Sequence, residues 1–183
     1  LDFKVTPINK KELESSEILD YLEKKYNLHY LAPLDARNTG FESEKFDFMS
    51  SSVTMEHIPQ EHILNILLEN YRILKKGGIL SMTIDYQDHW SYFDSNINIY
   101  NFLKYSDREW QKYNPSLHYQ NRMRHSEYMS IVDQTEFSVV LNNTRKVTEE
   151  QKMMLSNTPL DKKYKDFIFD DLVITGTEIV LRK

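Results

Sequence analysis

The feature that most constrains this chain is a strand–helix–strand run between residues 46 and 84. Residues 46–53 form a short apolar stretch that enters a serine-rich turn, and residues 79–84 form another. Between them, residues 60–75 carry isoleucine and leucine at helical spacing on a broad face, and Gly77-Gly78 follows. Two strands joined by such a helix pair in parallel through a right-handed crossover. The run predicts an α/β protein.

The rest of the chain adds further elements to this unit. Helical spacing predicts helices at residues 8–26 and 125–134, and a short apolar stretch predicts another strand at residues 29–34. Residues 137–147 and 172–181 are predicted to form an antiparallel pair, with a bulge at Thr175-Gly176. The expected fold is a three-layer, mostly parallel sheet with this antiparallel pair at its C-terminal end.

Composition limits the organisation and the partners. The 183 residues, 40% hydrophobic and 28% charged, suit one globular domain over residues 1–183. A net charge of −5 argues against nucleic acid as the main partner. The chain has no cysteine, which excludes disulfides and thiolate nucleophiles and favours a cytoplasmic location. No apolar run is long enough to cross a membrane.

Residues 86–124 break the alternation of strands and helices. They are polar and aromatic and follow the end of the strand predicted at residues 79–84. A segment of this length at a strand end is more typical of a functional insertion than of a simple connection. We therefore predict a substrate-side insertion over residues 86–124; the alternative is that its aromatic residues only close the segment over the sheet.

Three segments, in order, resemble class I S-adenosylmethionine-dependent methyltransferases. They are Ala-Pro-Leu-Asp-Ala at residues 32–36, the stretch at residues 46–59 that contains Glu-His before an apolar residue, and Tyr-Arg-Ile-Leu-Lys-Lys-Gly-Gly-Ile-Leu at residues 71–80. The order and spacing of all three together carry the resemblance. It implies a Rossmann-like sheet and S-adenosylmethionine as the cofactor.

The resemblance also implies a cofactor-binding set. Asp35 would accept from the adenine amine, and the backbone near Ser51 would lie under the methionine part of the cofactor. The full set is Asp35, Ala36, Ser51, Ser52, Glu56 and His57. Two structural alternatives stay open: Asp35 caps a turn, and the Glu56-His57 pair favours the N-terminus of the following helix.

The methyl acceptor is expected to meet residues of the insertion. Methyl transfer is an in-line displacement that needs alignment and, for a hydroxyl or amine, removal of a proton. His89 is the predicted catalytic base, with His118 and His125 as further candidates and a surface-loop histidine as the alternative. The predicted substrate-contacting residues are Tyr86, Trp90, His118 and Arg122.

Two other features of the insertion leave their roles open. Arg122 and Arg124 suit either an anionic acceptor or pairing with the acidic surface. No metal site is expected, because Asp85, Asp88 and His89 lack a characteristic metal-site spacing.

The aromatic and polar character of the insertion suits a small-molecule or saccharide acceptor. It resembles methyltransferases associated with surface-polysaccharide biosynthesis, a looser resemblance than the one over residues 27–84.

One element of the family is absent from the sequence. The four glycines, Gly40, Gly77, Gly78 and Gly176, form no Gly-x-Gly loop, so the first strand, its glycine-rich loop and the first helix are expected upstream of Leu1. The edge of the strand at residues 46–53 would then be exposed and invite a homodimer or another segment. The rival hypothesis is a catalytically incompetent methyltransferase-like domain that serves as an interaction or dimerisation module.

The missing loop leads to a prediction about cofactor affinity. Each charge-assisted hydrogen bond contributes about 1.5–3 kcal/mol, so loss of two or three removes roughly 4 kcal/mol or more, a factor of about 10³ in affinity. Isothermal titration of these 183 residues with S-adenosylmethionine should show no binding below the millimolar range. Adding the upstream strand, loop and helix should restore micromolar affinity. Tight binding by the chain as it stands would mean that another segment replaces the loop.

Overall fold

A computed structural model describes residues 17–183, which fall into two compact units divided after Asp35. In the described part of the first unit, helix α1 spans Ile18–Tyr26. Asn27 ends it in the left-handed region at φ 52°, with its N–H bonded to the Glu23 carbonyl. The described part of the helix predicted at residues 8–26 is confirmed from Ile18, and residues 8–16 lie outside the described range.

The strand predicted at residues 29–34 does not form. The segment is exposed and has no ladder partner, and Pro33 lacks the N–H that a strand interior would need. A short apolar run does not by itself distinguish a strand from an extended connection, and the prediction of a strand at residues 29–34 was wrong.

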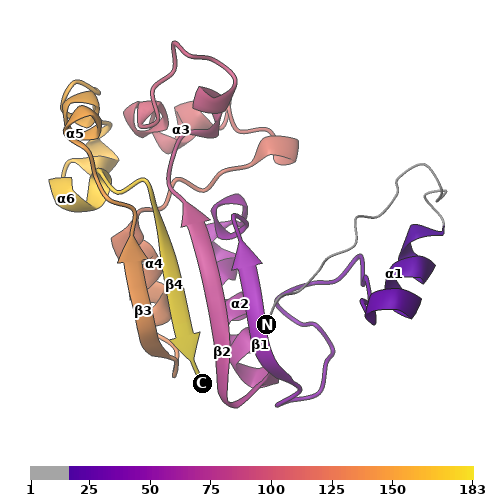
Figure 1. Cartoon of the computed structure of the whole chain (residues 1–183). Coiled ribbons are helices and arrows are strands. Elements are labelled where there is room, and N and C mark those ends of the chain that lie inside the picture. Colours follow the sequence, from indigo (N-terminus) through magenta and orange to yellow (C-terminus); the bar gives the residue numbers. More distant parts are fainter. Residues whose placement is uncertain (1–16) are drawn as a thin grey trace. The chain divides into compact units, whose positions relative to one another are not determined.

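The second unit, residues 36–183, is built on a four-stranded sheet in the order β1-β2-β4-β3 (Figure 1). Its strands are β1 at Phe46–Ser52, β2 at Leu74–Asp85, β3 at Ser138–Thr144 and β4 at Gly176–Arg182. β1 and β2 pair in parallel, and β4 is antiparallel to both β2 and β3. The predicted parallel neighbours and the predicted antiparallel pair are both confirmed. Only one pair is parallel in the described sheet.

Helix α2, Gln60–Ile73, makes the crossover between β1 and β2. The helix ends two residues earlier than predicted because Leu74 is already extended and pairs with Phe46. Gly77 and Gly78 therefore lie inside β2 and do not stop the helix. Gly77 has φ 77°, and a Cβ on Gly78 would lie 2.8 Å from the Lys75 carbonyl oxygen, so glycine serves backbone geometry at this point.

The remaining helices are short. They are α3 at Asp107–Trp110, α4 at His125–Val132, α5 at Glu149–Ser156 and α6 at Phe169–Leu172, with single 3₁₀ turns at Met55–His57, His89–Tyr92, Asn101–Lys104, Ser116–His118 and Lys162–Tyr164. The β2–β4 register is continuous from Ile79 to Asp85, so the bulge predicted at Thr175-Gly176 is absent from this pairing. An irregularity lies instead between Val139 and Leu141 of β3.

Helices α2 and α4 lie on the same face of the sheet (Figure 1). Alternate side chains of β2 and β4, among them Leu80, Met82 and Ile179, point into the core that these helices cover. On the opposite face Phe48 is 61% exposed. Within residues 36–183 no helix covers that face, so this unit supplies only two of the three expected layers. None of the helices among residues 17–183 is long and apolar enough to span a bilayer.

An ion pair between the buried Glu69 and the partly exposed Arg72 connects residues 36–45 to α2. Glu69 is 7% exposed, and its carboxylate accepts from Arg72 at 2.8 Å and from the Thr39 backbone N–H at 2.8 Å. Arg72 also donates to the Phe41 carbonyl at 2.7 Å. The Arg72 hydrogen bonds, with help from Thr39, lower the pKa of Glu69 to about 2.

Glu69→Gln should destabilise the fold at neutral pH by about 1–3 kcal/mol, because it weakens a charge-assisted pair. The pKa of Glu69 is lowered on folding, so its stabilisation is complete above the unfolded value near 4.3 and is lost as pH falls toward about 2. Urea unfolding at several pH values should show the gap between the two proteins closing in acid. Glu42→Gln, at an exposed carboxylate, is the matched control; a pH-independent gap would contradict the account.

Candidate active site

Two turns meet where β1 and β2 end. The parallel register pairs Ser52 with Thr83, so the chain leaves both strands at the same edge of the sheet. Val53 follows β1 with φ 48°, an uncommon conformation for a β-branched residue, and its N–H donates to the Thr83 carbonyl at 2.9 Å. Ligands in open α/β sheets bind at such strand ends, which directs attention to the residues that follow each strand.

Glu56 reaches from the first turn to the second. It is 1% exposed, and its Oε1 accepts from the Asp85 backbone N–H at 3.3 Å. Its Oε2 is buried and accepts no hydrogen bond within the described part of the chain. Burial raises the pKa of this carboxyl group. A buried carboxylate with a spare oxygen is costly for folding alone, which is typical of a functional position.

His57 is more exposed than Glu56, and its ring is held by Tyr119, near the end of the insertion. Its Nδ1 donates to the Tyr119 carbonyl at 2.7 Å. This hydrogen bond fixes the tautomer and leaves Nε2 with a lone pair. The side chain is therefore oriented as a base or as a metal ligand.

His89 lies beside them at the end of β2. It is 7% exposed, its ring is 4.9 Å from the His57 ring centroid, and it stacks on Tyr92 at 5.2 Å. Its Nε2 is buried without a hydrogen-bond partner among the residues described. Burial lowers the pKa of His89, against a smaller opposing influence of Asp85, and so favours the neutral imidazole.

These three side chains form a single cluster, the Glu56–His57–His89 cluster. One ligand-type atom from each lies within 4.8 Å of the others. His118 is near the cluster, with its ring centroid 6.1 Å from that of His89 and 4.9 Å from Trp90. Two residues predicted to bind cofactor thus share a site with the predicted base.

Asp85 is close to the cluster but its carboxylate is already engaged. It accepts from the Tyr92 hydroxyl at 2.5 Å and from the Gln87 N–H at 3.0 Å, and Arg145 lies 3.6 Å away. Asp88 is fully buried and caps the following turn by accepting from the Trp90 N–H at 2.9 Å. Both aspartates therefore shape the turn after β2.

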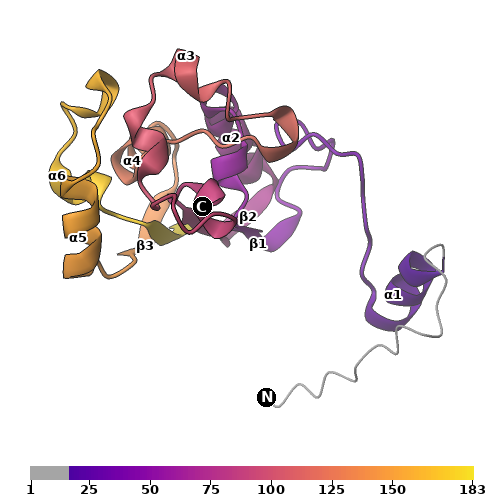
Figure 2. The same ribbon diagram turned by 90° about the horizontal axis from the view of Figure 1, so that it is seen from above.

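The returning segment, residues 119–121 near the end of the insertion, is hydrogen-bonded to the turns after β1 and β2. Asn121 Nδ2 donates to the Met55 and Ile58 carbonyls at 2.9 and 2.8 Å. Gln120 donates to the Gln87 carbonyl and accepts from the His89 N–H at 3.3 Å. Figure 2, viewed toward the carboxyl ends of β1 and β2, shows the insertion lying over this edge of the sheet. The role of residues 86–124 as a substrate-side insertion stays a prediction.

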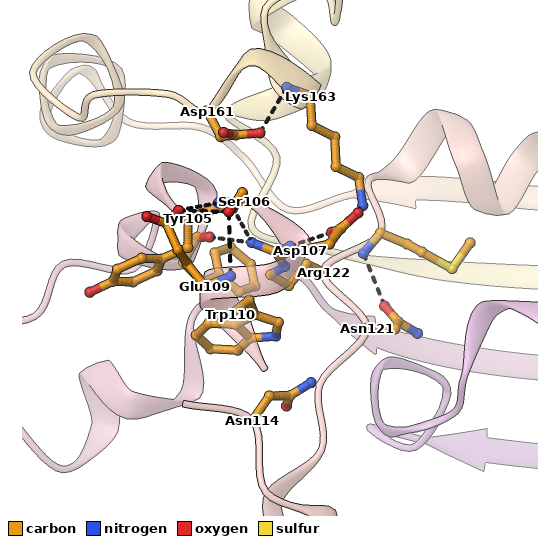
Figure 3. A network of polar contacts seen from close by, with 12 residues as sticks. Tyr105, Ser106, Asp107, Glu109, Trp110, Asn114, Asn121, Arg122, Asp161 and Lys163 are labelled. Atoms are coloured by element: carbon orange, nitrogen blue, oxygen red, sulfur yellow. Dashed lines mark hydrogen bonds and ion pairs between the residues drawn. The ribbon is translucent and has the colours of Figure 1, made fainter. Parts of the chain in front are cut away.

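Arg122 is fixed inside the insertion (Figure 3). The guanidinium is 3% exposed and donates to the Phe102 and Tyr105 carbonyls and to Asp107. Asp107 also pairs with Lys163 at 2.9 Å. These contacts favour the structural alternative for Arg122, and acceptor binding by this residue stays an untested prediction.

Arg124 has a similar internal role. It is fully buried and donates to the Tyr86, Leu172 and Ile174 carbonyls. It also lies over the Tyr86 ring, 5.4 Å from the centroid. These bonds join the ends of the insertion to the chain that enters β4, so Arg124 is positioned to hold the fold together and not to meet an acceptor.

Two of the predicted acceptor contacts also have internal partners. Tyr86 is 2% exposed, and its hydroxyl hydrogen-bonds with His125 at 3.2 Å. Trp90 donates from its indole N–H to the Tyr113 carbonyl at 2.9 Å and is only half-buried. Of the two, Trp90 is the one left with surface to offer a ligand.

Comparison with known proteins gives a family match over part of the chain. Residues 12–82 match the methyltransferase domain family. This match covers less than half of the chain and shows similarity to that family over this segment. Comparison with curated protein sequences gives no match.

Solved structures agree with the methyltransferase fold at low identity. A methyltransferase from Archaeoglobus fulgidus is 12% identical with TM-score 0.50, and covers 90% of this chain and 72% of its own. A protein from Galdieria sulphuraria assigned as a sarcosine dimethylglycine methyltransferase is 15% identical with TM-score 0.51, and the match covers 91% of this chain and 64% of that protein. The [4+2]-cyclase SpnF is 10% identical with TM-score 0.52, and the match covers 92% of this chain and 62% of SpnF.

S-adenosylmethionine is the cofactor that the resemblance implies, and its contacts with the described residues stay a prediction. The turn after Ser51 and Ser52, with Val53 in the left-handed region, lies at the carboxyl end of β1. All four glycines lie elsewhere in structural positions or in the connection at Gly40, so a glycine-rich loop is absent from residues 17–183. Asp35 closes the first unit and Ala36 opens the second, and their cofactor role stays a prediction.

Arg124→Met should unfold more easily than the parent by roughly 3 kcal/mol or more, since it leaves three buried carbonyls without a charged donor. Urea denaturation followed by circular dichroism measures this. Arg108→Met, at an exposed arginine in the same insertion, should stay within about 0.5 kcal/mol of the parent. Equal effects of the two changes would show that the carbonyl contacts of Arg124 do not stabilise the fold.

Proposed function

We propose that this methyltransferase domain transfers a methyl group from S-adenosylmethionine to a hydroxyl or amine of a small-molecule acceptor. The observation that carries the proposal is the convergence of Glu56, His57 and His89 at the carboxyl ends of β1 and β2. In this proposal the turn at Ser51, Ser52 and Glu56 borders the cofactor, as the family resemblance implies. His89 faces the acceptor from the next strand end.

The chemistry asks little of the protein beyond alignment and proton removal. The acceptor's lone pair forms the new bond to the methyl carbon, while the carbon–sulfur bond breaks and its electron pair stays on sulfur. The acceptor's proton passes to His89, whose buried Nε2 has no other partner among the described residues. His57, oriented by the Tyr119 carbonyl, stands next to it.

The insertion supports an acceptor with both polar and flat apolar surface. Half-buried Trp90 and exposed Phe93 lie against His118. A shallow polar depression also borders the returning segment, lined in part by Asp107, Asn114, Tyr119 and Lys163. Aromatic faces beside amide and charged groups suit a saccharide, so a sugar-type acceptor is the finer form of the proposal, in the context of surface polysaccharides.

The second candidate is a non-catalytic interaction module. Two observations favour it: the absence of a Gly-x-Gly loop from the sequence, and the unpaired outer edge of β1 in the described sheet, which suits self-association into a homodimer. The similarity to a [4+2]-cyclase adds that this fold is compatible with other activities. The buried, unpartnered atoms of the cluster favour the enzyme, because an interaction module has no use for them.

The test uses a form of the protein that also carries the upstream strand, loop and helix. Release of S-adenosylhomocysteine is measured with a panel of hydroxyl and amine acceptors, sugars included. His89→Ala should lower the rate by about 10² or more while leaving cofactor affinity nearly unchanged. His62→Ala, whose ring contacts Arg37 outside the cluster, is the control. If His89→Ala weakens cofactor binding as much as it slows transfer, His89 is structural.

A further inference from the structure

The Glu56–His57–His89 cluster has the composition of a metal site. It offers one carboxylate oxygen and two imidazole nitrogens, all within 4.8 Å of one another. We propose that these three side chains bind one divalent transition-metal ion of the zinc type. The sequence analysis expected no metal site because Asp85, Asp88 and His89 lack a metal-site spacing. In the structure the residues that lie near His89 are Glu56 and His57, from the turn after β1, and not the two aspartates.

The donor set selects the class of ion. Two histidines and one carboxylate with an open fourth position are typical of catalytic zinc, whereas Mg²⁺ and Ca²⁺ prefer all-oxygen ligands. Bonds of about 2.0–2.1 Å in a tetrahedral site place the ligand atoms roughly 3.3 Å apart. The cluster is wider than that, so binding requires the side chains to converge by small rotations.

Two of the three proposed ligands already have the outer hydrogen-bond partner that a metal site needs. The His57 Nδ1–H donates to the Tyr119 carbonyl, which leaves Nε2 for the ion. Oε1 of Glu56 accepts from the Asp85 N–H, which leaves Oε2. The His89 ring stacks on Tyr92 and keeps Nε2 unpartnered within the described residues.

Burial supplies the second, independent argument. Glu56 is 1% exposed and His89 is 7% exposed, and each carries a buried polar atom that has no partner among residues 17–183. Such atoms are rare in folded proteins, because a buried donor or acceptor without a partner is costly. One cation would satisfy both atoms together. Asp85, the nearest other carboxylate, is engaged by Tyr92 and Arg145 and is not needed.

The proposed binding of a metal ion by the cluster does not depend on methyl transfer. The role of that ion in catalysis rests on the proposed function. An ion at this position would have its open coordination site at the strand ends, where the acceptor is proposed to lie. Coordination of an acceptor hydroxyl lowers its pKa, so its proton leaves to solvent and its oxygen attacks the methyl carbon. His89 then contributes as a ligand, and loss of His89 slows transfer in either case.

Binding is tested on the chain itself after removal of metal. Zn²⁺ is titrated in competition with a chromophoric chelator, and Co²⁺ is titrated while its visible d–d absorption is recorded. We expect one equivalent bound, and weakening of at least about 100-fold in Glu56→Gln, His57→Ala and His89→Ala, since loss of an outer partner alone costs about 10–100-fold. His62→Ala should match the parent.

Circular dichroism and urea unfolding check that the variants fold. His57 is the most open of the three, and Glu56→Gln keeps the side-chain shape, so these two decide the matter if His89→Ala fails to fold. Weak binding of several equivalents that is unchanged by the substitutions, or no binding at all, would overturn the site. An anomalous signal from Zn²⁺ in a crystal, placed at the cluster, would support it.

The catalytic role is tested separately, with a strong chelator added to the form that carries the upstream segment. Loss of transfer on chelation and recovery with Zn²⁺ would support the role. Undiminished transfer after metal removal would refute the role while leaving the measured binding intact. Failure to transfer a methyl group with or without metal would refute the proposed function and would not bear on the binding result.

Discussion

The parallel pairing of β1 with β2 is the interaction on which the rest of the site depends. Because the register places Ser52 opposite Thr83, the turns after the two strands begin at the same level. Glu56 can then reach the Asp85 N–H, and His89 can lie against His57. A slip of one residue would turn every side chain of β1 to the opposite face, and neither contact would form.

The fold was predictable where sequence periodicity and burial agree. The strand–helix–strand unit and the C-terminal antiparallel pair carry clear patterns, and both are present. Prediction failed at residues 29–34, where a short apolar stretch is exposed and contains Pro33. It also failed at the end of α2, because the pairing of Leu74 with Phe46 is a long-range contact that a local Gly-Gly signal cannot reveal.

The site was predictable residue by residue but not as a group. Sequence alone assigned Glu56 and His57 to the cofactor and His89 to proton removal, and gave no sign that the three converge. It also could not show that Arg122 and Arg124 donate to backbone carbonyls. Any residue can provide a carbonyl, so such partners leave no trace in residue identity, and the two arginines resemble ligand-binding residues until their surroundings are known.

The sheet face that no helix of residues 36–183 covers has a consequence for handling the protein. Phe48 and Leu141 are 61% and 40% exposed on β1 and β3, and Ser81 and Arg182 lie on the strands between them. Apolar surface of this kind raises the tendency to associate as concentration increases, while the net charge of −5 opposes it through mutual repulsion. Colloidal behaviour should therefore depend on ionic strength, with added salt screening the repulsion and favouring association.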